Sequence, residues 1–310
     1  MRQVKLLYKG VDIYTDIHVS ECVYESFITN HLPKLRIVFD NSDYEFDTWS
    51  MKQNDSIRLL DDGIDTGRLY VNSIHPHNAG YELTASPLKA LHINQKTTKE
   101  WKKITFRQVM EELAKRHALQ ASFYGITTNQ TYSYLLQNNE RDFAFAARIA
   151  TLEGCCIVLY NDTMIVAKER YLEGLQASEM EIDEYLSCNI TSTVPWGKCT
   201  VSDGNKIQAG YQNKKANIIG GEFYSVIDLV ESKVQAERYA RNLLRHRNKN
   251  CYSGILVSDE LLQGYSAGSV VNIVSSDYPT AEGKAIIFRL RHDLVNGKSK
   301  VWFRKCLEGY

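Results

Sequence analysis

Proline is scarce in this sequence, which has five prolines in 310 residues beside nineteen tyrosines. Disordered chains are rich in proline and poor in aromatic residues, so a largely disordered protein is excluded. Tyrosine favours strands. The composition therefore predicts an ordered protein with much β-structure, long enough for roughly two to four small domains.

A surplus of charge of either sign is also absent. The chain has 37 basic and 37 acidic side chains, with 24% charged and 44% hydrophobic residues, as expected for a globular protein. General nucleic-acid binders usually carry a basic excess. The charge balance therefore argues against nucleic-acid binding as the main function.

Long hydrophobic runs are missing. Residues 1–14 contain neither the apolar core nor the cleavage site of a secretory signal. No apolar run approaches the length of a membrane span, so we expect no membrane insertion. The seven cysteines are odd in number and form no C-x-x-C pair, which fits synthesis in a reducing cytoplasm rather than a disulfide framework.

Motifs of common catalytic sites are absent as well. The sequence has no G-x-S-x-G, no H-E-x-x-H and no phosphate loop. Carboxylates are numerous, so a hydrolase pair stays open, but sequence position singles out none. We therefore assign no catalytic, cofactor-binding or metal-binding residue, expect no cofactor, and predict that the protein is not an enzyme.

Three small groups carry side chains typical of metal or redox sites. They are His75 with His77 and His92, Asp61 with Asp62 and Asp65, and Cys155 with Cys156. The histidines lack further ligands at a recognisable spacing, and the aspartates lack the glutamate that closes a calcium loop, so we predict a solvated loop and a turn. Adjacent side chains on a strand point to opposite faces, which predicts one buried and one outward cysteine.

A basic cluster follows residue 237 and includes Arg238, Arg241, Arg245, His246 and Lys249. It could face nucleic acid, or it could be a helix end paired with acidic neighbours or subunits. We favour the second interpretation, because basic residues suit the negative end of a helix dipole. A conduit for DNA should also avoid phosphate contacts, since each one adds salt-dependent affinity.

Short strands separated by turn residues occupy both ends of the chain. In residues 3–91 they are predicted at 4–8, 34–39, 56–60, 67–74 and 80–85. After an acidic connection at 168–190, they are predicted at 189–194, 198–202, 207–211, 253–257, 268–274, 284–291 and 300–304. Such patterns favour antiparallel barrels or sandwiches. Asp228, with Glu231 three residues later, predicts a helix from there to about residue 247.

The stretch from Trp101 to Gly154 contains two predicted helices with a strand at 131–137 between them. Thr105 and Gln108 can form a capping box at the first helix. Asn139 is predicted to open the second helix, with Asp142 in its first turn and Gly154 just past its end. Residues 155–160 and 163–167 then predict a hairpin around an Asn-Asp turn.

This middle stretch resembles the late control protein D family, the tail hub proteins of contractile-tailed phages and related particles. The matching residues are Trp101, Thr105, Val109, Leu113, Ala114, His117, Leu119, Gln137, Asn138, Asn139, Glu140, Asp142, Phe143, Phe145, Arg148, Ile149, Ala150 and Gly154. Residues 267–274 resemble a strand of the same family, so the resemblance extends over nearly the whole chain.

The resemblance implies an α+β, mostly β fold with two tail-tube-like antiparallel β-barrels, an inserted small α/β module and a long helix. The implied domains are 1–91 for the first barrel, 92–185 for the module, and 186–310 for the second barrel with the helix at about 228–247. It further implies a homotrimer whose pseudo-sixfold ring joins the tail tube protein to the spike protein and contacts other baseplate proteins. DNA would at most pass through the channel.

The implied location is the tail baseplate of a virion or phage-tail-like particle made in the bacterial host cytoplasm. Three alternatives stay open: the hub portion of another contractile injection system such as type VI secretion, a tail-associated cell-wall hydrolase, and a nucleic-acid module. Because the sequence stops at Tyr310, soon after the second β region, we expect no fused hydrolase domain and no long spike.

Overall fold

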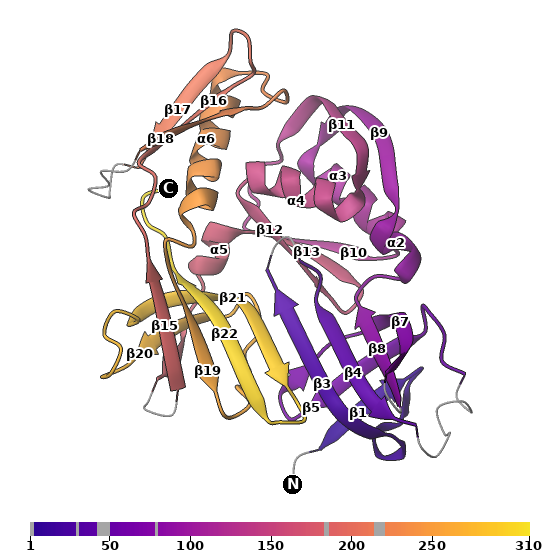
Figure 1. Ribbon diagram of the computed structural model, residues 1–310. Helices are drawn as coiled ribbons and strands as arrows, with labels where there is room; N and C mark the ends of the chain where they lie inside the picture. The colour runs from indigo at the N-terminus through magenta and orange to yellow at the C-terminus, as the bar shows by residue number, and fades with distance from the viewer. Residues whose placement is uncertain (1–2, 29–30, 42–49, 78–79, 183–185, 214–220) are drawn as a thin grey trace.

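A computed structural model describes residues 3–28, 31–41, 50–77, 80–182, 186–213 and 221–310 (Figure 1). Strands outnumber helices among these residues, so the predicted α+β, mostly β fold class is confirmed. In Figure 1 two β regions lie side by side, and the middle module and the long helix lie at one end of them.

The first β region is antiparallel throughout. Its elements are β1 (Val4–Tyr8), β2 (Val11–Asp12), η1 (Tyr14–Asp16), β3 (His18–Phe27), β4 (Lys34–Asp40), β5 (Ser56–Asp61), β6 (Ile64–Asp65), β7 (Leu69–His77) and β8 (Gly80–Ser86). Alternate residues of β5 are buried, as expected for a strand with one face on a core. Leu6 of β1 and Cys22 of β3 belong to one core, although these strands are not neighbours in the sheet. The sheet therefore curls around its own core.

The second β region encloses a separate core and, unlike the first, includes one parallel strand pair. Its strands are β14 (Ser178–Glu181), β15 (Leu186–Ser192), β19 (Tyr252–Ser258), β20 (Val270–Val274), β21 (Gly283–Asp293) and β22 (Lys298–Lys305). Leu256, Val271, Ile287 and Phe303 meet in the core.

One ladder fuses the two β regions into a single sheet, which has 14 strands among the described residues. Strand β21 pairs antiparallel with β3, from Arg289 opposite Phe27 to Asp293 opposite Val23. Along the main path of described strands, β15 stands at one end and β2 at the other. The molecule thus has two β cores within one continuous hydrogen-bonded sheet.

The middle module packs helices on small sheets. It contains α2 (Ala90–Asn94), β9 (Lys96–Thr105), α3 (Phe106–Arg116), β10 (Gln120–Tyr124), β11 (Thr131–Arg141), α4 (Asp142–Leu152), β12 (Cys155–Tyr160), β13 (Thr163–Lys168) and α5 (Glu169–Glu173). The predicted capping box of Thr105 and Gln108 is present. So is the predicted hairpin, whose turn residues Asn161 and Asp162 have φ values of 45° and 58°.

The predicted start of the second helix at Asn139 is wrong. Strand β11 continues to Arg141, which lies opposite Lys96 of β9 beyond a bulge between Gln137 and Glu140. Asn139 has φ 50° at this bulge, and α4 begins at Asp142. Asparagine tolerates the left-handed conformation that a bulge requires, so here it marks the bulge and not a helix cap.

The predicted start of the long helix is also too early. Helix α6 spans Lys233–Asn248, and the side chain of Ser232 accepts a hydrogen bond from the Gln235 backbone N–H. Glu231 does not form the expected box with Asp228. The Glu231 carboxylate accepts two hydrogen bonds from Ser133, one from the backbone N–H at 2.9 Å and one from the side-chain hydroxyl at 2.8 Å. This tertiary contact takes the place of the local cap.

Helix α6 and three strands pack on the module. The strands are β16 (Lys198–Ser202), β17 (Gln208–Gln212) and β18 (Glu222–Val226). Val201, Tyr239 and Leu244 share one core with Phe145 and Ile149 of α4. These elements fall within residues 186–310, the predicted second barrel, but their core is that of the module.

Both members of the vicinal cysteine pair are buried, so the prediction of one outward thiol is wrong. Cys155 is 1% exposed and Cys156 is fully buried. Cys155 belongs to the module core, and burial raises its pKa to about 12. Burial also raises the pKa of Cys156, with the nearby Glu169 carboxylate adding to the effect. Strand β12 is therefore covered on both faces.

Candidate functional site

The residues considered for metal binding do not converge. The predicted loop around His75 and His77 is wrong, because both residues lie in strand β7. The His92 ring packs edge-on against His117 at 4.9 Å between centroids. Asp61 and Asp65 flank the predicted turn between β5 and β6, and Asp65 accepts a hydrogen bond of 2.9 Å from Arg58. Within the described ranges, no group of three histidine, cysteine or acidic side chains could hold a metal ion.

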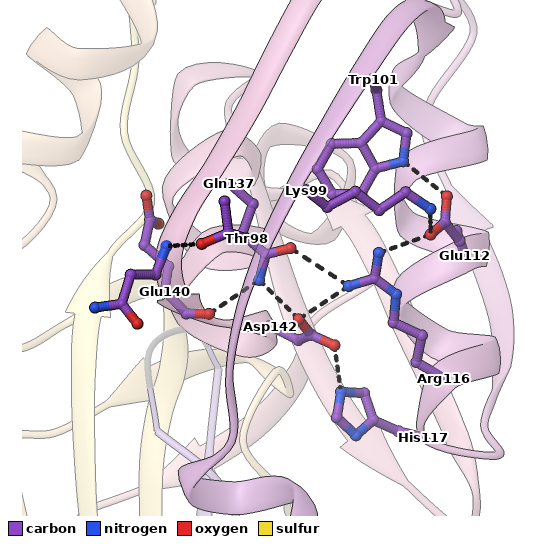
Figure 2. Close-up of polar contacts among 10 residues, drawn as sticks. Thr98, Lys99, Trp101, Glu112, Arg116, His117, Gln137, Glu140 and Asp142 are labelled. Carbon is purple, nitrogen blue, oxygen red and sulfur yellow. Dashed lines mark hydrogen bonds and ion pairs between the residues drawn. The ribbon is translucent and has the colours of Figure 1, made fainter.

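Residues that carry the family resemblance instead converge on one polar network in the module (Figure 2). The Asp142 carboxylate, in the first turn of α4, accepts hydrogen bonds from Gln137 at 2.7 Å, Arg116 at 3.1 Å and His117 at 3.0 Å. These partners come from β11 and from the end of α3. One carboxylate thereby joins α3, β11 and α4.

A second carboxylate extends this network to β9. Glu112 accepts hydrogen bonds from the Trp101 indole at 2.7 Å, from Arg116 at 2.7 Å and from Lys99. The Trp101 ring stacks on Phe145 of α4, with centroids 5.3 Å apart and planes 6° apart. The signature tryptophan is thus held between the network and the module core.

The network keeps both carboxylates ionised. Burial acts to raise the pKa of Asp142, but hydrogen bonds from His117 and Gln137 and the charge of Arg116 outweigh it and lower the pKa to about 2. Burial likewise opposes ionisation of Glu112, and hydrogen bonds from Lys99, Trp101 and Arg116 lower its pKa. Carboxylates with such low pKa values are poor general acids or bases near neutral pH. This arrangement suits a rigid structural joint.

A second ionic cluster joins the module, α6 and the second β region. Arg304 of β22 is 1% exposed and contacts Glu173 at 2.5 Å and Glu169 at 3.2 Å. Arg245 of α6 contacts Glu173 at 2.5 Å, and Lys249 contacts Glu169 at 3.5 Å. Burial opposes the charge of Glu169, and these cations lower its pKa.

The basic cluster is therefore largely paired with acidic neighbours, as the favoured interpretation expected. Besides Arg245 and Lys249, Arg238 contacts Glu153 at 3.2 Å. The carboxylates of α5 were missed as partners because they are distant from α6 in the sequence. The only signal in the sequence is the spacing of Glu169 and Glu173, four residues apart, which places both carboxylates on one face of a helix.

Apolar side chains gather on exposed strands near this end of the molecule. Tyr224 and Val226 of β18 are 70% and 73% exposed, and Val194 after β15 is 77% exposed. Strand β18 is an edge of its three-stranded sheet, and β15 is an edge of the large sheet. Exposed edges with apolar side chains are typical of surfaces that meet other subunits.

Comparisons with known proteins find solved structures with the same fold. No protein-family model and no curated protein sequence matches the chain. A tail protein from Neisseria meningitidis MC58 superposes with a TM-score of 0.75 at 12% identity, covering 100% of this chain and 98% of that one. The prophage MuSo2 43 kDa tail protein from Shewanella oneidensis gives a TM-score of 0.74 at 8% identity, covering 98% of both chains.

A third solved structure is an Escherichia coli component of the type VI secretion system, described as structurally similar to the bacteriophage T4 tail proteins gp27 and gp5. It gives a TM-score of 0.63 at 15% identity and covers 99% of this chain and 78% of that one. The chain has the fold of phage tail proteins. It keeps that fold along its whole length, including the module that carries the sequence resemblance. In the described residues, no helix combines the length and hydrophobicity needed to cross a membrane.

Proposed function

We propose that the chain is a non-enzymatic, structural tail hub protein of a contractile phage tail or phage-tail-like particle. Three copies form a pseudo-sixfold ring in the baseplate, to which each subunit contributes its two β regions. The ring joins the tail tube protein on one side to the spike protein on the other and contacts further baseplate proteins. DNA at most passes through its channel.

One observation carries this proposal: the two β regions share a single sheet through the ladder of β21 and β3, while each keeps its own core. Such a subunit supplies two similar, rigidly linked segments to a ring. Among the described strands, β15 and β2 end the main path of the sheet. Pairing of these two edges with neighbouring subunits would close the sheet and leave no open edge. Likeness to phage tail proteins over the whole chain supports the same role.

A second candidate is the hub portion of another contractile injection system, favoured by the likeness to the type VI secretion component. Both candidates share the same architecture, and they differ in the partners above and below the ring. A cell-wall hydrolase predicts peptidoglycan cleavage. Absence of cleavage together with ring formation supports the structural role.

Binding to both neighbours tests the proposal. The purified chain is mixed with the tail tube protein and the spike protein encoded beside it, and complexes are separated by size-exclusion chromatography with light scattering. We expect a complex that contains all three proteins, with three copies of this chain. If the chain fails to bind the tail tube protein, or fails to bind the spike protein, the proposal is overturned.

A further inference from the structure

A basic cavity lies where α6 meets α5 and the end of β13. Its volume is about 480 Å³, and its lining residues include Lys168, Arg170, Arg238, Arg241 and Arg245. The three arginines of α6 are spaced by three and four residues, so they lie on one face of the helix. Lys168 and Arg170 come from the end of β13 and the start of α5. Five cations from three elements thus surround one hollow.

Acidic groups compensate only part of this charge. Arg238 contacts Glu153 at 3.2 Å, and Arg245 contacts Glu173 at 2.5 Å. Arg241 instead lies over the Tyr211 ring, 5.9 Å from its centroid, and Arg170 is exposed. Across the described ranges, neither of these two side chains has an acidic partner. Because no carboxylate of the described residues balances these two guanidinium groups, the cavity retains a positive surplus in a chain of zero net charge.

One lining arginine also keeps an unused donor. The Nε atom of Arg238 is buried, and no described group accepts a hydrogen bond from it. Arg245 Nε, by contrast, lies 3.7 Å from the Glu169 carboxylate, and the Arg245 side chain is only 3% exposed. Arg170 is exposed and Arg241 is partly exposed, so these two guanidinium groups offer the donors that an oxyanion in the cavity can reach.

We propose that this cavity binds a phosphate-type oxyanion, either free phosphate or a phosphate monoester. Guanidinium groups present paired N–H donors that match phosphate oxygens, and the mixture of arginine and lysine supplies both fixed and adaptable contacts. The inference is independent of the tail hub role.

The test is titration calorimetry of the full chain with sodium phosphate and with glycerol 3-phosphate, at constant ionic strength maintained with chloride. The variants are Arg241→Gln and Arg170→Gln. Arg247→Gln is the matched control, because Arg247 lies on the same helix and also covers an aromatic ring, Phe223 at 5.3 Å, but does not line the cavity. Circular dichroism checks that each variant is folded.

We expect saturable binding that weakens about tenfold or more in both cavity variants, as for the loss of a charge-assisted hydrogen bond, and stays unchanged in the control. Saturable binding of either compound supports the proposal. Tighter binding of the monoester identifies an esterified ligand, and tighter binding of inorganic phosphate identifies free phosphate. Absence of saturable binding to either compound overturns the proposal. Equal weakening by Arg247→Gln also overturns it, because the affinity would then belong to a diffuse basic surface such as one for nucleic acid.

Discussion

At the scale of residues, Asp142 holds the module together. Its carboxylate is nearly buried and receives three hydrogen bonds from two other elements. Replacement by asparagine keeps the size but removes the charge that Arg116 faces. Arg116 keeps its second partner Glu112, but the amide offers one acceptor oxygen in place of two, so one of the buried donors that face position 142 loses its acceptor.

Asp142→Asn should therefore lower the free energy of unfolding by about 2 kcal/mol. The control is Glu140→Gln, which removes a more exposed pair with Arg148, 2.8 Å away, and should cost less than about 1 kcal/mol. Urea unfolding followed by tryptophan fluorescence measures both. Equal losses in the two variants would contradict the assigned role.

Two histidines, the buried His292 and the partly buried His246, predict how stability depends on pH. Burial lowers the pKa of His292, and burial with the charge of Lys249 lowers that of His246, in both cases from 6.5 to about 4. Between pH 4 and 6.5 the unfolded chain binds more protons than the folded chain. Their contribution to stability is thus complete above pH 6.5 and is lost as the pH falls toward 4.

Urea midpoints measured at several pH values across this window should fall as the solution becomes more acidic. His292→Gln should flatten that slope, because it removes one of the two groups. The His292 ring bonds Ser299 at 2.9 Å, and glutamine can replace that contact. An unchanged slope in the variant would show that the pKa of His292 is not lowered by folding.

At the scale of elements, the start of α6 in the structure differs from the start that the sequence pattern predicts. The structure places the cap at Ser232, whereas sequence pattern favours Asp228. Ser232→Ala should destabilise the protein by about 1 kcal/mol, the usual cost of losing an N-cap. Asp228→Ala should have little effect. The reverse ranking in thermal or urea unfolding would place the start of the helix four residues earlier.

Local signals predicted the elements whose partners are close in sequence. The capping box of Thr105 and Gln108 and the hairpin at Asn161 depend on residues within a few positions, so sequence pattern was sufficient. Asn139 and Glu231 misled the helix boundaries, because β9 and Ser133 bind them from far along the chain. Burial of both Cys155 and Cys156 likewise depends on elements that cover β12 from two sides.

At the scale of the whole molecule, one sheet with two cores is the main feature that sequence could not reveal. The ladder between β21 and β3 joins residues more than 260 positions apart, as does the contact of Arg289 with Glu25 at 3.1 Å. No local pattern encodes such a pairing. The same applies to the Arg304 cluster, which ties β22 to α5. These contacts make the subunit a rigid building block.

The symmetry of the assembled protein tests the central claim most directly. Electron-microscope class averages of the purified chain, alone and with the spike protein encoded beside it, would show its arrangement, and light scattering would give its mass relative to the 35.5 kDa subunit. The account predicts a threefold ring with a central hole and six similar β segments around it, at the latest when the spike is added. A monomer, or an assembly without threefold symmetry even in the presence of the spike, would contradict it.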